Sequence, residues 1–170
     1  AGYGRPPRLD ARWSVHAVRG LRSAQALGLD PDRAVADSAY LLASLDWASL
    51  RQPGGEVVVV PHHRSLRYVD WEQVCARAGA RFLSPLLPAG EFMSALAGAR
   101  LVLTEAMHGA IVADTLRIPW IPVAISPAVE EFKWRDWTQS MELPFKPQRL
   151  TAGTHRDVGR VANMESILRK

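Results

Sequence analysis

The stretch EVVVVPHHRS, residues 56–65, decides the fold class of this chain. Four consecutive valines indicate a strand whose two faces are both apolar, which is typical of a parallel sheet covered by helices on either side. The segment RQPGGE at residues 51–56 leads into it, and its proline and glycines indicate a linker. The residues PHHRS follow where the strand ends. The sequence therefore predicts a buried parallel strand that runs into a polar loop.

Short apolar runs alternate with helix-like segments on both sides of this strand. The pattern predicts further strands at residues 16–18, 34–36, 81–83, 100–103 and 120–125. It predicts helices at residues 21–27, 69–78, 88–96, 105–116, 129–140 and 157–168, and a helical or irregular segment at 39–50. Because strands separated by helices form right-handed βαβ units, we predict an α/β fold with a Rossmann-like parallel sheet.

The composition excludes several classes of protein. The chain has 170 residues, about the size of one domain, and its 48% hydrophobic and 22% charged residues exclude a disordered tail. No apolar run approaches the roughly 20 residues of a membrane helix, and the opening AGYGRPPRLD lacks the apolar core of a signal peptide. The single cysteine, Cys75, excludes a disulfide framework and indicates a reducing compartment. Its place inside a predicted helix indicates a core residue rather than a nucleophile.

The charge pattern favours small anions over nucleic acid as ligands. The 21 lysines and arginines exceed the 17 acidic residues, and all but three of the basic residues are arginines, which bind phosphate and carboxylate through paired hydrogen bonds. The charges are dispersed, so no nucleic-acid partner is expected. The sequence lacks GxxxxGK[ST], GxGxxG after a strand, and GxSxG, which argues against a nucleoside triphosphatase, a dinucleotide dehydrogenase and an α/β-hydrolase.

The first candidate cluster is TEAMHG, residues 104–109, which follows a predicted strand. Ligands of open parallel sheets bind beyond the carboxyl ends of the strands. Thr104 is predicted to cap the next helix, and the free amides at the start of this helix form an anion site. Glu105 and His108, three residues apart on one helix face, are a candidate acid–base pair, and Gly109 would let a ligand or a neighbouring backbone approach closely. The alternative is that Glu105 only complements the helix dipole and His108 is an ordinary helix residue.

The second cluster is PHHRS, residues 61–65, at the end of the valine strand. Arg64 could grip a carboxylate or a phosphate, assisted by His62 and His63. Two adjacent histidines at a strand end are expected to point to opposite sides, so no metal site is predicted here. A surface ion pair is the alternative role for Arg64.

The third cluster is FKWRDW, residues 132–137, where charged and aromatic residues alternate. Lys133 and Arg135 suit phosphate or carboxylate groups. Trp134 and Trp137 are three residues apart on a predicted helix and could offer an aromatic face to a sugar ring. The alternative is an amphipathic helix that packs in the core.

Five segments, taken in order, resemble the polysaccharide pyruvyl transferase family, nearest to its succinoglycan-type members in exopolysaccharide assembly. They are VHAVRGLRSAQALGL, AVADSAYLL, VVVVPHHRS, LTEAMHGAIVADTLRIPWIPV and FKWRDWTQSMEL, and they cover most of residues 15–143. The resemblance implies the two-domain GT-B architecture of glycosyltransferases and a chain longer than this one. On this basis residues 1–50 are a remnant of the N-terminal domain plus the crossover, and residues 56–170 are the Rossmann-like C-terminal domain. The missing front half leaves open whether this chain alone is active.

The resemblance implies an enzyme that transfers pyruvate from phosphoenolpyruvate to a sugar of an exopolysaccharide, or of its lipid-linked precursor, as a cyclic ketal. His108 falls on the family's histidine at a helix start and is the predicted general acid and base, with Glu105 orienting it or relaying its proton. Arg64 falls on a strand-end arginine that holds phosphoenolpyruvate. Many members carry an arginine where this chain has Ala106. We therefore expect other cationic residues of this chain to make the anion contacts of that arginine. The predicted substrate-binding residues are Arg64, His63, Thr104, Met107, Gly109, Lys133, Arg135 and Trp137.

The same resemblance implies a bacterial, cytoplasmic transferase that needs no metal and no cofactor, with phosphoenolpyruvate as its donor substrate. Its acceptor would be a sugar or a lipid-linked oligosaccharide, which implies work at the inner face of the cell membrane in peripheral association with the assembly machinery. Two other functions stay open. One is a GT-B glycosyltransferase that uses a nucleotide sugar, and the other is a truncated, non-catalytic partner domain in polysaccharide assembly, which Ala106 favours.

Overall fold

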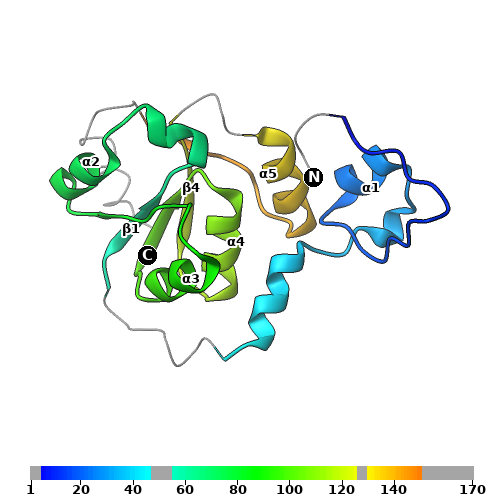
Figure 1. The fold of residues 1–170 in the computed structure, drawn as a ribbon, viewed down its shortest axis with the longest axis horizontal. Helices are drawn as coiled ribbons and strands as arrows, with labels where there is room; N and C mark the ends of the chain where they lie inside the picture. Colours follow the sequence, from blue (N-terminus) through cyan, green and yellow to red (C-terminus); the bar gives the residue numbers. More distant parts are fainter. Residues whose placement is uncertain (1–4, 47–54, 126–129, 151–170) are drawn as a thin grey trace. The chain divides into compact units, whose positions relative to one another are not determined.

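The computed structural model describes residues 5–46, 55–125 and 130–150 (Figure 1). The described residues form two compact units, one of residues 5–41 and 130–145 and the other of residues 42–46, 55–125 and 146–150. We call them the N-terminal unit and the sheet unit. The predicted boundaries put all residues from 56 onward in one domain, whereas helix α5 (Glu131–Ser140) groups with the N-terminal unit.

The sheet unit contains five parallel strands in the order β2-β1-β3-β4-β5, so the predicted α/β fold with a Rossmann-like parallel sheet is confirmed. The strands are β1 (Val57–Val60), β2 (Arg81–Phe82), β3 (Leu101–Thr104), β4 (Trp120–Ala124) and β5 (Gln148–Arg149). The first four lie where the apolar runs predict them. The sequence does not predict β5, because a polar strand of two residues carries no hydrophobic pattern.

The four valines of β1 build the core on both faces of the sheet, as their sequence predicts. The first and third pack with residues of helix α2 (Trp71–Arg77). The second and fourth pack with residues of helices α3 (Ala89–Ala97) and α4 (Met107–Thr115). None of the four is more than 1% exposed. The sheet is therefore covered by α2 on one face and by α3 and α4 on the other.

The first part of the chain is less regular than predicted. Helix α1 (Leu21–Leu27) forms at the predicted residues, and Gly28 ends it in a left-handed conformation (φ 65°) that glycine adopts without strain. The two strands predicted here reduce to one parallel bridge between Val18 and Ala34, because the segments are too short and polar to pair further.

Two short 3-10 helices, η1 (Pro31–Arg33) and η2 (Ser38–Ser44), complete this part of the chain. The helix predicted at residues 157–168 lies outside the described residues. Among the helices of the described segments, none combines the length and the hydropathy needed to cross a membrane.

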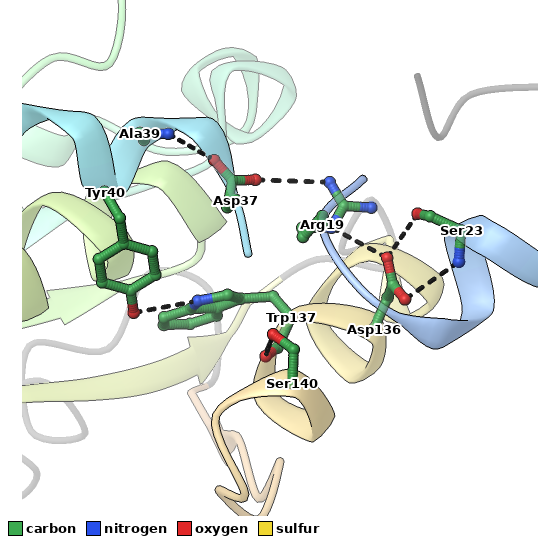
Figure 2. Close-up of polar contacts among 8 residues, drawn as sticks. All are labelled: Arg19, Ser23, Asp37, Ala39, Tyr40, Asp136, Trp137 and Ser140. Atoms are coloured by element: carbon green, nitrogen blue, oxygen red, sulfur yellow. Dashed lines mark hydrogen bonds and ion pairs between the residues drawn. The ribbon is translucent and has the colours of Figure 1, made fainter. Parts of the chain in front are cut away.

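A buried polar network joins α5 to α1 within the N-terminal unit (Figure 2). Asp136 of α5 is fully buried, and its carboxylate accepts hydrogen bonds from the backbone N and the hydroxyl of Ser23 and lies 3.2 Å from Nε of Arg19. Ser23 is the third residue of α1, so this carboxylate caps a helix whose own cap residue, Gly20, has no side chain. A Cβ at Gly20 would collide with Asp136, which explains the glycine in the VRG sequence.

Candidate active site at the switch point of the sheet

The strand order creates a switch point between β1 and β3. The chain that leaves β1 passes through α2 to β2, whereas the chain that leaves β3 passes through α4 to β4, in the opposite direction and over the opposite face. Ligands of such sheets bind in the crevice at the carboxyl ends of the strands where these connections diverge. Residues 61–64 leave β1 here and residues 105–108 leave β3. The structure therefore brings the first two predicted clusters to one edge of the sheet.

Glu105 follows β3 directly and ties three strand ends together. It is 1% exposed, and its Oε2 accepts a hydrogen bond from the backbone N of His62 at 3.1 Å. Its Oε1 accepts a hydrogen bond from the backbone N of Ile125 at 2.7 Å, just after β4. Its own backbone N donates to the carbonyl of Val60 at 3.0 Å, in β1. The carboxylate is thus a buried anchor between neighbouring strands.

Helix α4 begins at Met107, two residues later than the sequence predicts. Thr104 ends β3, and its hydroxyl bonds to the backbone N and O of Ala106 at 3.0 and 2.9 Å, so its predicted role as a helix cap is wrong. The prediction that Glu105 and His108 share a helix face is wrong as well, because Glu105 precedes the helix. The cap position belongs to Ala106, whose methyl group accepts no hydrogen bond, and the first amides of α4 therefore suit an anion.

The first turn of α4 exposes His108 and packs the residues on either side of it onto the sheet. Met107 is buried, which leaves its backbone amide as the group that suits the predicted anion site. Gly109 is buried too, and a Cβ there would lie 2.7 Å from the hydroxyl of Thr104 and 3.3 Å from Val60. Side chains of β3 and β1 make a close approach at Gly109, and a ligand contact there stays a prediction.

The loop after β1 exposes Arg64 and buries His62. His62 precedes a short 3-10 helix, η4 (His63–Arg67), and its Nδ1 accepts a hydrogen bond from the backbone N of Arg64 at 3.3 Å. The rings of His62 and His63 lie 4.2 Å apart, so the prediction that they point to opposite sides is wrong: they belong to a turn rather than to an extended strand. The sequence patterns do not predict that the ring of His62 caps the 3-10 helix. A histidine just after a strand and two residues before Arg64 could have indicated this hydrogen bond.

The third predicted cluster lies on α5 and belongs to the N-terminal unit. Trp134 and Trp137 are buried, and Nε1 of Trp137 donates to the hydroxyl of Tyr40 at 3.2 Å (Figure 2). These tryptophans form the core face of an amphipathic helix, and a sugar contact at Trp137 stays a prediction. Arg135 is exposed and pairs at 3.0 Å with a glutamate one turn away on the same helix, and Lys133 is half-buried.

Cys75 lies in the core, as predicted. Burial raises the pKa of its thiol to about 12, so the group stays protonated at neutral pH and is a poor nucleophile. In the segments that the structure describes, no three His, Cys, Asp or Glu side chains gather closely enough to hold a metal ion.

The fold is thus an α/β fold with a doubly wound parallel sheet, and its switch point carries a histidine, an arginine and a helix start without a side-chain cap, groups that suit a small anion. Residues 8–127 match the family model of polysaccharide pyruvyl transferase, and the chain belongs to this family, as its sequence motifs predict. It is 31% identical over 159 residues to the succinoglycan biosynthesis protein ExoV of Rhizobium meliloti (strain 1021), in an alignment that covers 92% of this chain and 50% of that protein. The chain thus spans about half the length of this curated relative. No solved structure matches the chain.

Proposed function

We propose that this chain carries the phosphoenolpyruvate site of an enzyme that attaches pyruvate, as a cyclic ketal, to a sugar of an exopolysaccharide or of its lipid-linked precursor. Membership of the family supports the transfer of pyruvate to a polysaccharide. The observation that carries the finer proposal is the switch point, where exposed Arg64 and exposed His108 stand on the two connections that diverge from β1 and β3.

Phosphoenolpyruvate carries a phosphate and a carboxylate, and this edge of the sheet offers partners for both. The guanidinium of Arg64 can hold one group through paired hydrogen bonds. The amides of the first turn of α4, from Met107 onward, can hold the other with the help of the helix dipole. His63, exposed next to Arg64, is proposed as a further anion contact. Arginine and helix amides neutralise the phosphate in this scheme, so it requires no metal.

Ketal formation needs a proton donor and a base near C2 of phosphoenolpyruvate. We assign to His108 the protonation of the methylene carbon, which makes C2 cationic and open to attack by the first sugar hydroxyl. The proton of that hydroxyl returns to His108. The second hydroxyl attacks C2 as the bond from C2 to the phosphate oxygen breaks, and its proton leaves with the phosphate. The products are the ketal and inorganic phosphate, so atoms and charge balance.

Thermal unfolding with added ligands tests the donor site. A ligand at 100 times its Kd stabilises the folded state by about 2.7 kcal/mol, so phosphoenolpyruvate should raise the melting midpoint, whereas UDP and GDP should not. Arg64→Ala should abolish the rise. Arg77→Ala is the matched control, because it removes an exposed arginine from the last turn of α2, whereas Arg64 lies in the loop that precedes this helix. Stabilisation by UDP or GDP instead would favour a nucleotide-sugar glycosyltransferase, and no shift with any of the three ligands would favour a non-catalytic partner domain.

A further inference from the structure

Glu105 connects the two loops that carry Arg64 and His108. Its Oε2 accepts a hydrogen bond from the backbone N of His62, and the ring of His62 in turn accepts one from the backbone N of Arg64. Glu105 itself stands immediately ahead of the cap residue of α4, three residues before His108. A continuous series of hydrogen bonds therefore runs from the residue ahead of α4 to the backbone of Arg64.

The second oxygen of Glu105 extends this anchor to β4. Its Oε1 accepts a hydrogen bond from the backbone N of Ile125, and β3 lies between β1 and β4 in the sheet. Each oxygen thus holds the end of a different neighbouring strand. A carboxylate accepts at both oxygens, whereas a glutamine accepts at one end only and would set its NH2 group against a backbone N–H. The anchor therefore requires an acidic side chain and not merely one of this size.

The same geometry points to positioning rather than proton transfer. Glu105 is 1% exposed, and each of its oxygens already accepts a backbone N–H, as buried polar groups that fix a structure do. We propose that Glu105 is a positioning residue of the pyruvyl transfer site. As a double acceptor it sets the spacing between the loop of Arg64 and the start of α4. This inference rests on the proposed function.

Glu105→Gln in the full-length enzyme tests the inference, because it keeps the size of the side chain and removes one acceptor. The KM for phosphoenolpyruvate should rise roughly tenfold to a hundredfold, as expected for one unsatisfied buried donor, while the pH profile of kcat keeps its shape. Hydrogen exchange at the backbone N of His62 or Ile125 should become faster. Glu56→Gln is the matched control, because this exposed carboxylate pairs with Arg81 at 3.1 Å ahead of β1, at the opposite edge of the sheet.

Each alternative outcome has a distinct signature. An unchanged KM with unchanged exchange would overturn the proposal, and loss of one limb of the pH profile with an unchanged KM would make Glu105 an acid or base instead. Should Glu105→Gln fail to fold, His62→Ala decides, because it removes the ring that holds the backbone N of Arg64 and must also raise the KM. If the wild-type enzyme does not use phosphoenolpyruvate, the proposed function fails, and faster exchange at His62 or Ile125 still decides whether Glu105 holds the loops.

Discussion

Asp136 and Glu105 are both buried carboxylates, one in each compact unit, yet their partners differ in kind. Asp136 lies beside the guanidinium of Arg19 and caps α1, so its charge is balanced inside a pair of packed helices (Figure 2). Glu105 instead accepts hydrogen bonds from the backbone at the ends of two other strands. The first carboxylate caps a helix inside its unit, whereas the second joins strand ends at the switch point, the edge where ligands of such sheets bind. Changes in the N-terminal unit should therefore alter stability, and changes at the switch point should alter activity.

The largest expected effect is that of His108→Ala. It removes the proposed proton donor, and general acid–base catalysis contributes about 10²–10⁴-fold, so ketal formation should fall by at least about 100-fold. Because the side chain is exposed, the free energy of unfolding should change by less than about 0.5 kcal/mol. Phosphate release and the methyl signal of the ketal in NMR spectra measure the rate, and urea unfolding measures the stability.

His16→Ala is the control for this variant, because it removes an exposed histidine from the N-terminal unit. Its rate of ketal formation should equal that of the wild type. If His108→Ala forms the ketal at nearly the wild-type rate, His108 is not the proton donor. The contrast between a unit that sets stability and a sheet edge that sets activity would then fail.

Asp136→Ala should lower the stability of the protein by about 3–5 kcal/mol, the usual result of removing one partner of a buried ion pair. The substitution takes away the nearer carboxylate of Arg19 and uncaps α1. Urea unfolding measures the loss, and Asp10→Ala, at an exposed pair with Arg12, should leave the unfolding midpoint where it is. The contrast with Glu105 fails if Asp136→Ala instead abolishes phosphoenolpyruvate binding while stability is unchanged.

The sequence predicts the sheet far better than it predicts these anchors. Four valines indicate β1 because a strand buried on both faces leaves a local apolar pattern. The partners of Glu105 are backbone groups 43 and 20 residues away along the chain, and no local pattern encodes them. Thr104 followed by Glu105 is typical of a helix start, yet the threonine hydroxyl closes a turn on Ala106 and delays α4. Local signals identify the elements, and tertiary hydrogen bonds decide what the polar residues between them do.

Helix α5 shows a second limit of the same kind. Its spacing of tryptophans predicts a buried face, and the structure confirms that Trp134 and Trp137 are buried. Periodicity describes the face of a helix but not the partner of that face. Trp137 donates to the hydroxyl of Tyr40, 97 residues earlier, and Trp134 stacks on Phe145, and no periodicity encodes either partner.

Gly109→Ala should cost about 1–3 kcal/mol, the usual cost of overpacking a core. The new methyl group would lie 2.7 Å from the hydroxyl of Thr104, so α4 or the side chain of Thr104 must shift. Because α4 carries His108, the KM for phosphoenolpyruvate should rise as well, and steady-state kinetics and urea unfolding measure the two effects.

Two variants sharpen this result. Gly90→Ala in α3 is the matched control, because nothing lies within 4 Å of a Cβ added there, and it should leave both quantities close to wild type. Combining Gly109→Ala with Thr104→Ala should restore part of the stability by making room for the methyl group. Without any such recovery, the strain would have to arise somewhere other than at the contact between α4 and β3.

The smallest expected effect at neutral pH concerns Cys75, a buried titratable group of the sheet unit to which no role in the site is assigned. Burial raises the pKa of its thiol from the ordinary value of 9.0 to about 12. The folded protein therefore keeps this proton at pH values where the unfolded chain releases it, so the contribution to stability is complete below about pH 9 and declines as the pH rises toward 12. Above pH 9, the wild type should lose up to about 1.4 kcal/mol per pH unit more than Cys75→Ala does in urea unfolding, while ketal formation at neutral pH stays the same in both. Equal slopes in the two proteins would mean that water reaches the thiol in the folded state, which would contradict its place in the core.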